Sequence, residues 1–436
     1  MAKDGLYTAA QGSTNLVTNT QFNAASQPTI VSLGLGDSAN YLYYSTTGLM
    51  QKYTFTVGSP AKSMTGTLNW NANGTLRQLA INDGLNSGGT HTCNYGTSTV
   101  PGYDELGRLV KVDCGASIWQ QNFSYGNDAF DNLTKTVPPG GTGINWMPGY
   151  NQANNHYQLG GTSYDLNGNL LNDSFNVYTW DANWQKPISI GTAPNQAVCG
   201  TSGTCLIYDA FGRMVEKNVS GTYTQILYSP IGKTAIMNGQ TLVSAYIPLP
   251  GGETLFGTPT GQSFWYTDWL GTVRLSSSRA NRTFDFDRAF APFGETYLNF
   301  GSTSNPDFTG DTQDTVPGVN VGLFDTPNRE LHPNQGRWIS PDPLGSGWNR
   351  YAYVVNNPLS FIDPLGLKVG DCEDKPNAKC AHGGSAGVGS VPGKCFWIKL
   401  GRIRYSALGT SAVVPRTRTA GREWPVVGSG SHLLPK

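Results

Sequence analysis

The feature that most constrains the fold is a short motif that recurs along the first two thirds of the chain. It reads Tyr-Asp-x-x-Gly, and its clearest copies begin at Tyr103, Tyr164 and Tyr208. Asp bonds locally to the backbone in a turn, Gly tolerates a positive φ, and the residues that follow alternate, so each copy predicts a β-hairpin. Because one hairpin is not stable alone in water, we expect many hairpins to join edge to edge in an extended sheet.

Looser copies extend the pattern, beginning at Tyr44, Trp70, Tyr228 and Phe290. The composition agrees, because 55 Gly, 11% aromatic and 13% charged residues favour short strands and tight turns over long helices. The clearest copies are separated by 61 and then 44 residues, which disfavours an evenly repeating propeller. A generic β-sandwich with similar turns stays open as the alternative.

Charge is distributed unevenly along the chain. Residues 1–367 hold 18 Lys and Arg against 25 Asp and Glu, whereas residues 368–436 hold 11 against 4. The acidic main body gives no reason to expect a nucleic-acid partner. No apolar run is long enough for a transmembrane helix, and the start lacks the apolar core of a signal peptide.

Histidine and cysteine give no sign of a metal or cofactor. The seven cysteines form no paired CxxC set, and the histidines stand singly among turn residues. We therefore expect neither a metal nor another cofactor. Cys199 and Cys205 close a small loop in an oxidising compartment, but unpaired thiols in turns and core are the favoured interpretation.

Residues 340–367 contain the same tetrapeptide twice, because Asp342-Pro-Leu-Gly is repeated as Asp363-Pro-Leu-Gly. Two carboxyl groups held close together share a proton, and can supply both the base and the acid that peptide hydrolysis needs. Asp-Pro is also a common start of a turn, and the two roles are compatible. The residues between the two steps, Tyr351 and Tyr353 on one strand face among them, are interpreted as packing.

These features together resemble a known family. The Tyr-Asp-x-x-Gly units, followed by Arg329, the Gly-Arg-Trp turn and the two Asp-Pro steps in residues 321–367, are similar to the bacterial Rhs/YD-repeat proteins and their Rhs repeat-associated core. The resemblance implies an all-β fold in which repeated hairpins form an extended spiralling sheet, a partial shell closed by the core segment. A largely irregular C-terminal tail follows.

The resemblance also implies a domain organisation. Residues 1–300 are expected to be the YD-repeat hairpin region and residues 301–320 a linker. Residues 321–367 are expected to be the core, and residues 368–436 a variable tail that resembles a truncated effector. In the polymorphic toxin members of the family, the core is an aspartyl autoprotease that releases the segment after it.

Carried to this sequence, the resemblance implies that Asp342 and Asp363 are the catalytic pair. Arg329 is expected to hold one carboxylate ionised and oriented through a two-pronged hydrogen bond. The bond that is cut joins Leu367 to Lys368. Such an enzyme acts once, on its own chain, and the sequence does not say which Asp is the base.

The implied partners are the chain's own C-terminal segment, with an immunity protein, an export machinery and a carbohydrate left open. The implied location is the bacterial surface or exterior, reached from the cytoplasm by a route without a signal peptide. Two alternatives remain. One is a non-enzymatic YD-repeat scaffold or binding protein at the cell surface, and the other is an inert fragment of a toxin locus.

Overall fold

The computed structural model describes residues 15–96, 101–126, 128–182, 186–230, 232–301, 307–314, 322–345 and 347–367. The chain divides into two compact units, Met1–Cys395 and Phe396–Lys436, and every described residue belongs to the first. The tail predicted over residues 368–436 lies outside the described residues. Within the described part, no helix is long and apolar enough to cross a membrane.

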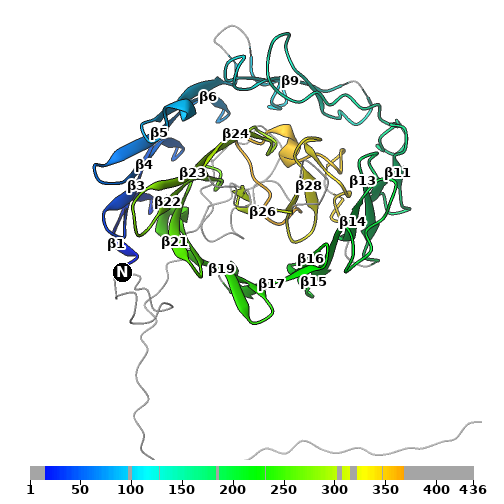
Figure 1. Ribbon diagram of the computed structural model, residues 1–436. Helices are drawn as coiled ribbons and strands as arrows, with labels where there is room; N and C mark the ends of the chain where they lie inside the picture. The colour runs from blue at the N-terminus through cyan, green and yellow to red at the C-terminus, as the bar shows by residue number, and fades with distance from the viewer. Residues whose placement is uncertain are drawn as a thin grey trace, which may run out of the picture. The chain divides into compact units, whose positions relative to one another are not determined.

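Two antiparallel sheets form a curved wall, and in each sheet every strand pairs with its neighbour in the sequence (Figure 1). The first sheet contains β1 (Val17–Phe22), β2 (Pro28–Leu33), β3 (Asp37–Tyr43), β4 (Met50–Val57), β5 (Lys62–Trp70), β6 (Leu76–Asp83), β7 (His91–Asn94), β8 (Lys111–Asp113), β9 (Gln120–Ser124) and β10 (Thr134–Thr136).

The second sheet is longer. It contains β11 (Ser163–Tyr164), β12 (Leu170–Asn172), β13 (Asn176–Trp180), β14 (Pro187–Thr192), β15 (Thr204–Tyr208), β16 (Met214–Val219), β17 (Thr222–Ser229), β18 (Gly232–Asn238), β19 (Thr241–Pro248), β20 (Thr254–Thr258), β21 (Gly261–Thr267), β22 (Val273–Ser278), β23 (Phe284–Phe290) and β24 (Thr296–Gly301). Short 3-10 turns lie at Ser87–Gly89, Pro250–Gly252 and Val354–Asn356.

Copies of the Tyr-Asp-x-x-Gly motif form some of the turns that join these strands, as between β11 and β12 and between β15 and β16. In the copy at Tyr208, the Asp209 carboxylate accepts hydrogen bonds from the backbone N–H groups of Phe211 and Arg213, at 2.9 and 3.0 Å. Gly212 has φ +75°, a conformation that favours glycine. β15 and β16 flank this turn as an antiparallel pair, so the prediction of an all-β fold built from hairpins is confirmed.

The final strands of the second sheet pack inside the curve of the first sheet, where β22 to β24 lie within the arc of β3 to β6 (Figure 1). Phe55 on β4 packs against Tyr266 on β21, with ring centroids 5.1 Å apart and the ring planes tilted by 35°. Asp37 on β3 forms an ion pair with Arg282, at 2.8 Å. These contacts join parts of the chain that are more than 200 residues apart in sequence.

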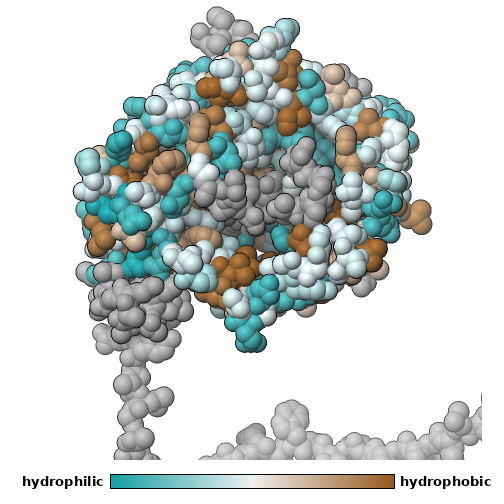
Figure 2. Space-filling view, viewed as in Figure 1, coloured by the Kyte–Doolittle hydropathy of each residue, from teal (hydrophilic) through white to brown (hydrophobic). Residues whose placement is uncertain are grey.

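A small third sheet lies inside the wall, made of β25 (Asp307–Phe308), β26 (Asp311–Asp314), β27 (Leu323–Asp325), β28 (Glu330–His332) and β29 (Arg337–Trp338). β25 and β26 fall within residues 301–320, the segment predicted as a linker. Most of the core segment is buried, with Trp338 only 1% exposed. The wall face in Figure 2 carries scattered apolar side chains among polar ones.

Direct hydrogen bonds fix the core segment to the wall. The Tyr351 hydroxyl donates to the Gly168 carbonyl at 2.7 Å, and the Trp269 indole N–H donates to the Leu359 carbonyl at 3.0 Å. Tyr351 and Tyr353 are buried as packing, but their backbone forms a turn with one isolated bridge and not the expected strand. The turn is enforced by positive φ at residues 354–356.

Candidate functional site

The two Asp-Pro steps form closely similar turns. Asp342 Oδ1 accepts the Leu344 N–H at 2.8 Å, and the Asp342 carbonyl accepts the Gly345 N–H at 3.0 Å. The Asp363 carbonyl accepts the Gly366 N–H at 3.2 Å, and its Oδ1 accepts the next N–H, that of Leu367, at 3.0 Å. Each turn mounts a buried carboxylate, 8% exposed at Asp342 and 3% exposed at Asp363.

One guanidinium nitrogen of Arg329 lies between the two carboxylates. Its Nη2 is 3.1 Å from Asp363 Oδ2 and 4.0 Å from Asp342 Oδ2. Arg329 directly precedes β28, so the third sheet delivers the cation to the two turns. The structure therefore brings together Asp342, Asp363 and Arg329, which lie up to 34 residues apart in sequence.

Arg329 is held from below and from the side. Its guanidinium lies over the Trp338 ring, 4.4 Å from the centroid, and its Nη1 donates to the Arg350 carbonyl at 3.2 Å. Its Nε donates to the Gly366 carbonyl. Burial lowers the pKa of Arg329, whereas the two neighbouring carboxylates raise it. The negative charges of Asp363 and Asp342 favour the cationic form of the Arg329 guanidinium.

This arrangement places two acidic groups beside the backbone that precedes the predicted cleavage point. Arg329 holds the carbonyl of Gly366, and Asp363 holds the amide of Leu367. Lys368 lies outside the described residues. Chemically, the site sets two carboxyl groups beside one guanidinium. Within the described ranges, no three His, Cys, Asp or Glu side chains gather as a metal site.

Buried ion pairs join the core segment to the wall, and they were not predicted from the sequence. Lys186, next to β14, is fully buried and contacts Asp325 and Glu330, at 2.5 and 2.6 Å. Burial alone lowers the pKa of Lys186, but the two carboxylates outweigh burial and raise it. Lys135 on β10 pairs with Glu295 of the wall and donates to the Pro333 carbonyl of the core segment, and here burial outweighs Glu295 and lowers the lysine pKa.

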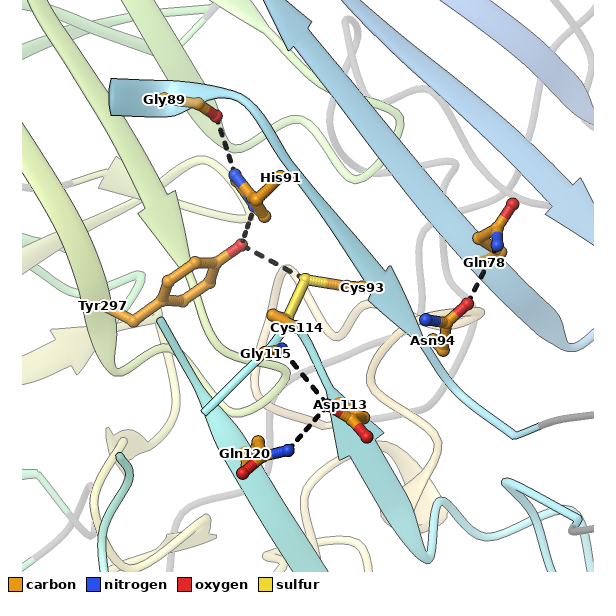
Figure 3. Close-up of a disulfide and its surroundings, with 10 residues drawn as sticks. All are labelled: Gln78, Gly89, His91, Cys93, Asn94, Asp113, Cys114, Gly115, Gln120 and Tyr297. Carbon is orange, nitrogen blue, oxygen red and sulfur yellow. Dashed lines mark hydrogen bonds between the residues drawn. A yellow bond between two sulfur atoms is a disulfide. The ribbon is translucent and has the colours of Figure 1, made fainter. Parts of the chain in front are cut away.

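Two disulfides, Cys93–Cys114 and Cys199–Cys205, correct the interpretation of these cysteines as unpaired. The sequence indicated the second pair only as a small loop, and it missed the first. Cys93 and Cys114 come together because β7 pairs with β8, although 21 residues separate them. Figure 3 shows this disulfide beside Tyr297, whose hydroxyl also contacts the His91 ring, with Nε2 2.8 Å away.

The fold is that of large toxin-complex shell proteins. A Tc holotoxin pore of Photorhabdus luminescens matches 83% of this chain with a TM-score of 0.64 at 15% identity, over 19% of its own chain. A TcdB2–TccC3–Cdc42 crystal structure matches 86% with a TM-score of 0.66 at 16% identity, over 20% of its own chain. The fold that the sequence predicted, a partial Rhs-type shell, is thus confirmed. No family model matches the sequence.

Sequence relatives include two toxins. The chain is 25% identical to the tRNA3(Ser)-specific nuclease WapA of Bacillus spizizenii over 288 residues, 61% of this chain and 12% of that protein. It is 32% identical to the toxin protein Tse5 of Pseudomonas aeruginosa over 136 residues, 30% of this chain and 9% of that protein.

A third relative is the uncharacterized protein YlbH of Escherichia coli, which is 50% identical over 52 residues, 12% of this chain. The aligned part covers only 22% of YlbH, so this chain spans a minor part of all three relatives. The similarities support a scaffold related to polymorphic toxins.

Proposed function

We propose that this chain is an Rhs/YD-repeat shell segment whose core cuts its own backbone once, between Leu367 and Lys368. The observation that supports the proposal is the position of Arg329. A single nitrogen of this side chain lies beside both carboxylates, while its Nε binds the carbonyl of Gly366. Paired acids and the backbone just before the cut are thereby gathered around one group.

The proposed reaction is hydrolysis of one peptide bond. An ionised carboxylate takes a proton from water, and the water oxygen attacks the Leu367 carbonyl carbon. The protonated carboxyl gives its proton to the Lys368 nitrogen as the C–N bond breaks. The products are a carboxylate at Leu367 and an amine at Lys368, and the two acids have exchanged one proton.

The contacts suggest a role for each acid. Asp363 lies 3.1 Å from the Arg329 guanidinium, so it is the carboxylate that stays ionised and acts as the base. Asp342 lies farther from the cation, at 4.0 Å, so the proposal assigns it the role of the acid.

The released segment, residues 368–436, is the first partner under this proposal, and an immunity protein and an export machinery are further ones. Carbohydrate is not required, because strand packing uses most of the aromatic side chains. Delivery outside the bacterial cell is the proposed location, by analogy with the toxin relatives.

One observation favours the second candidate, a non-enzymatic scaffold. Asp342 and Asp363 each complete a turn by accepting a backbone N–H, and Arg329 pairs with them as a structural ion would. In that case the chain stays intact after folding. An inert toxin-locus fragment predicts the same persistence.

Intact mass of the freshly folded chain, with an N-terminal tag, tests the proposal. We expect a product ending at Leu367 in the wild type and its absence from Asp342→Asn and Asp363→Asn. Asp209→Asn is the matched control, because Asp209 accepts the same kind of turn hydrogen bond and the described contacts of its carboxylate are to Phe211 and Arg213, not to the site residues. If all four folded chains remain uncut, the scaffold is favoured. If Asp209→Asn alone blocks cleavage, the assignment is wrong.

A further inference from the structure

The backbone from Asp363 to Leu367 is held by consecutive contacts just upstream of the proposed cut. The Leu365 carbonyl accepts two hydrogen bonds from Asn328, one from its backbone N–H at 3.1 Å and one from its side-chain Nδ2 at 2.9 Å. The Gly366 carbonyl accepts from Arg329 Nε. The Leu367 N–H donates to Asp363 Oδ1 at 3.0 Å. The two adjacent peptide groups that join Leu365 to Gly366 and Gly366 to Leu367 are therefore fixed in register.

Gly366 reinforces this register sterically. A Cβ at this position would lie 2.2 Å from Thr326 Oγ1 and 3.0 Å from the Arg329 backbone nitrogen. A one-residue slip in either direction brings a leucine side chain, from Leu365 or Leu367, into a space that accepts only hydrogen. The same slip moves each carbonyl by the distance of about 3.3–3.8 Å between consecutive residues. That displacement is as large as the reach of an attacking water.

We propose that Asn328 is the positioning residue that selects the Leu367–Lys368 bond for cleavage, by gripping the Leu365 carbonyl with two donors. This inference rests on the proposed self-cleavage. In the contacts described, Asn328 bonds to Leu365 and to neither carboxylate, so it acts through the placement of the backbone and not through proton transfer.

The chemistry of the side chain explains why asparagine suits this position. Its Nδ2 is a donor, and it is aimed at a carbonyl oxygen that the Asn328 backbone N–H already contacts. Asp has the same shape but offers only acceptors when ionised, so Asn328→Asp sets a negative charge against the Leu365 oxygen. Asn328→Ala removes one donor and adds no charge.

The test is a time course of refolding of the full chain, followed by intact mass. We expect Asn328→Ala to slow the cut by about 5- to 10-fold, the factor for one lost hydrogen bond. We expect Asn328→Asp to slow it by on the order of 100-fold. Both variants should also yield products that end at residues other than Leu367, because the backbone can slip.

The position of the new terminus separates positioning from a merely structural role. Asn349→Asp is the matched control, because Asn349 Nδ2 also donates twice, from the core segment to the Phe130 carbonyl and to Asn132 Oδ1 of the wall. That control should lower the melting temperature and still end at Leu367. If either Asn328 variant folds and cuts at Leu367 at the wild-type rate, the inference is overturned. An uncut wild-type chain overturns the proposed function with it.

Discussion

Acidification should weaken the fold through His91, a buried histidine beside the Cys93–Cys114 disulfide (Figure 3). Its Nδ1 is 2.7 Å from the Gly89 carbonyl and its Nε2 is 2.8 Å from the Tyr297 hydroxyl. Burial, and next to it the Arg274 cation, lower the pKa of His91 to about 4, against a weaker opposing effect of the Gly89 carbonyl and Asp83.

The direction in which stability changes with pH follows from the pKa of His91 in the folded and unfolded chains. The unfolded imidazole has a pKa of about 6.5 and the folded one a lower pKa, so the unfolded chain binds the extra proton as the pH falls. The contribution of His91 is present above about pH 6.5 and is lost as the pH falls toward 4. At pH 5 the loss corresponds to about 1.5 pH units at about 1.36 kcal/mol each, or about 2 kcal/mol.

The assay is urea unfolding at pH 7 and pH 5, comparing the wild-type sequence with His91→Gln, both in an Asp363→Asn background so that the chains are uniform. The stability advantage of the wild type over His91→Gln should shrink by about 2 kcal/mol between the two pH values. The comparison cancels the pH dependence of stability that other buried groups contribute. These groups include Asp287, whose pKa is raised by burial, and His332, whose pKa is lowered by burial.

His156→Gln is the matched control. Burial lowers the pKa of His156 also, but this side chain is only half-buried, so we expect a smaller change with pH. If the stability advantage of the wild type over His91→Gln is equal at pH 7 and pH 5, His91 does not make the fold sensitive to acid.

Three further predictions concern stability and the site. Lys186→Met should lower the free energy of unfolding by about 3–5 kcal/mol, because it removes the cation that pairs with the buried Glu330 carboxylate. Adding Glu330→Gln should restore part of this stability, as measured by thermal unfolding. Val355→Asn should raise the free energy of unfolding in urea by about 1 kcal/mol, because Val355 is 55% exposed and held at φ +48°, where Asn is better tolerated. An unchanged urea midpoint would show that the Val355 backbone is not strained. Gly366→Ala should abolish self-cleavage as measured by intact mass. Gly345→Ala, equally left-handed but with room for a Cβ 3.8 Å from the Arg350 guanidinium, should only slow it; equal rates would argue against the steric role of Gly366.

The hairpin turns were predictable from sequence because their chemistry is local. In the Tyr-Asp-x-x-Gly copy at Tyr103, the Asp104 carboxylate bonds to N–H groups two and four residues ahead, and Gly107 takes the positive φ. All partners lie within one turn, so the motif alone specifies it. The pairing of each strand with the next follows from the same turns.

The site was predictable only in part. The repeated Asp-Pro steps marked Asp342 and Asp363, and the resemblance marked Arg329. The contacts that bring the three together join separate segments of the chain, such as the Arg329–Asp363 ion pair across 34 residues. Asn328 carries no local pattern, since its significance depends on a carbonyl 37 residues away.

The buried cations were missed for a related reason. A lysine such as Lys186 is expected at the surface unless a partner is known, and its partners Asp325 and Glu330 lie more than 130 residues further along the chain. The Cys93–Cys114 pair was likewise missed, because the turn motif at Tyr103 predicts a hairpin but not the strand register that brings the two cysteines side by side.

The most direct test of self-cleavage by hydrolysis is to fold the full chain in water labelled with oxygen-18 and to determine the masses and termini of the products. We expect two fragments, one ending at Leu367 with one labelled oxygen in its new carboxylate and one beginning at Lys368. Asp342→Asn and Asp363→Asn should give neither. A folded wild-type chain that stays whole, a cut at another bond, or a product without the label would contradict this expectation.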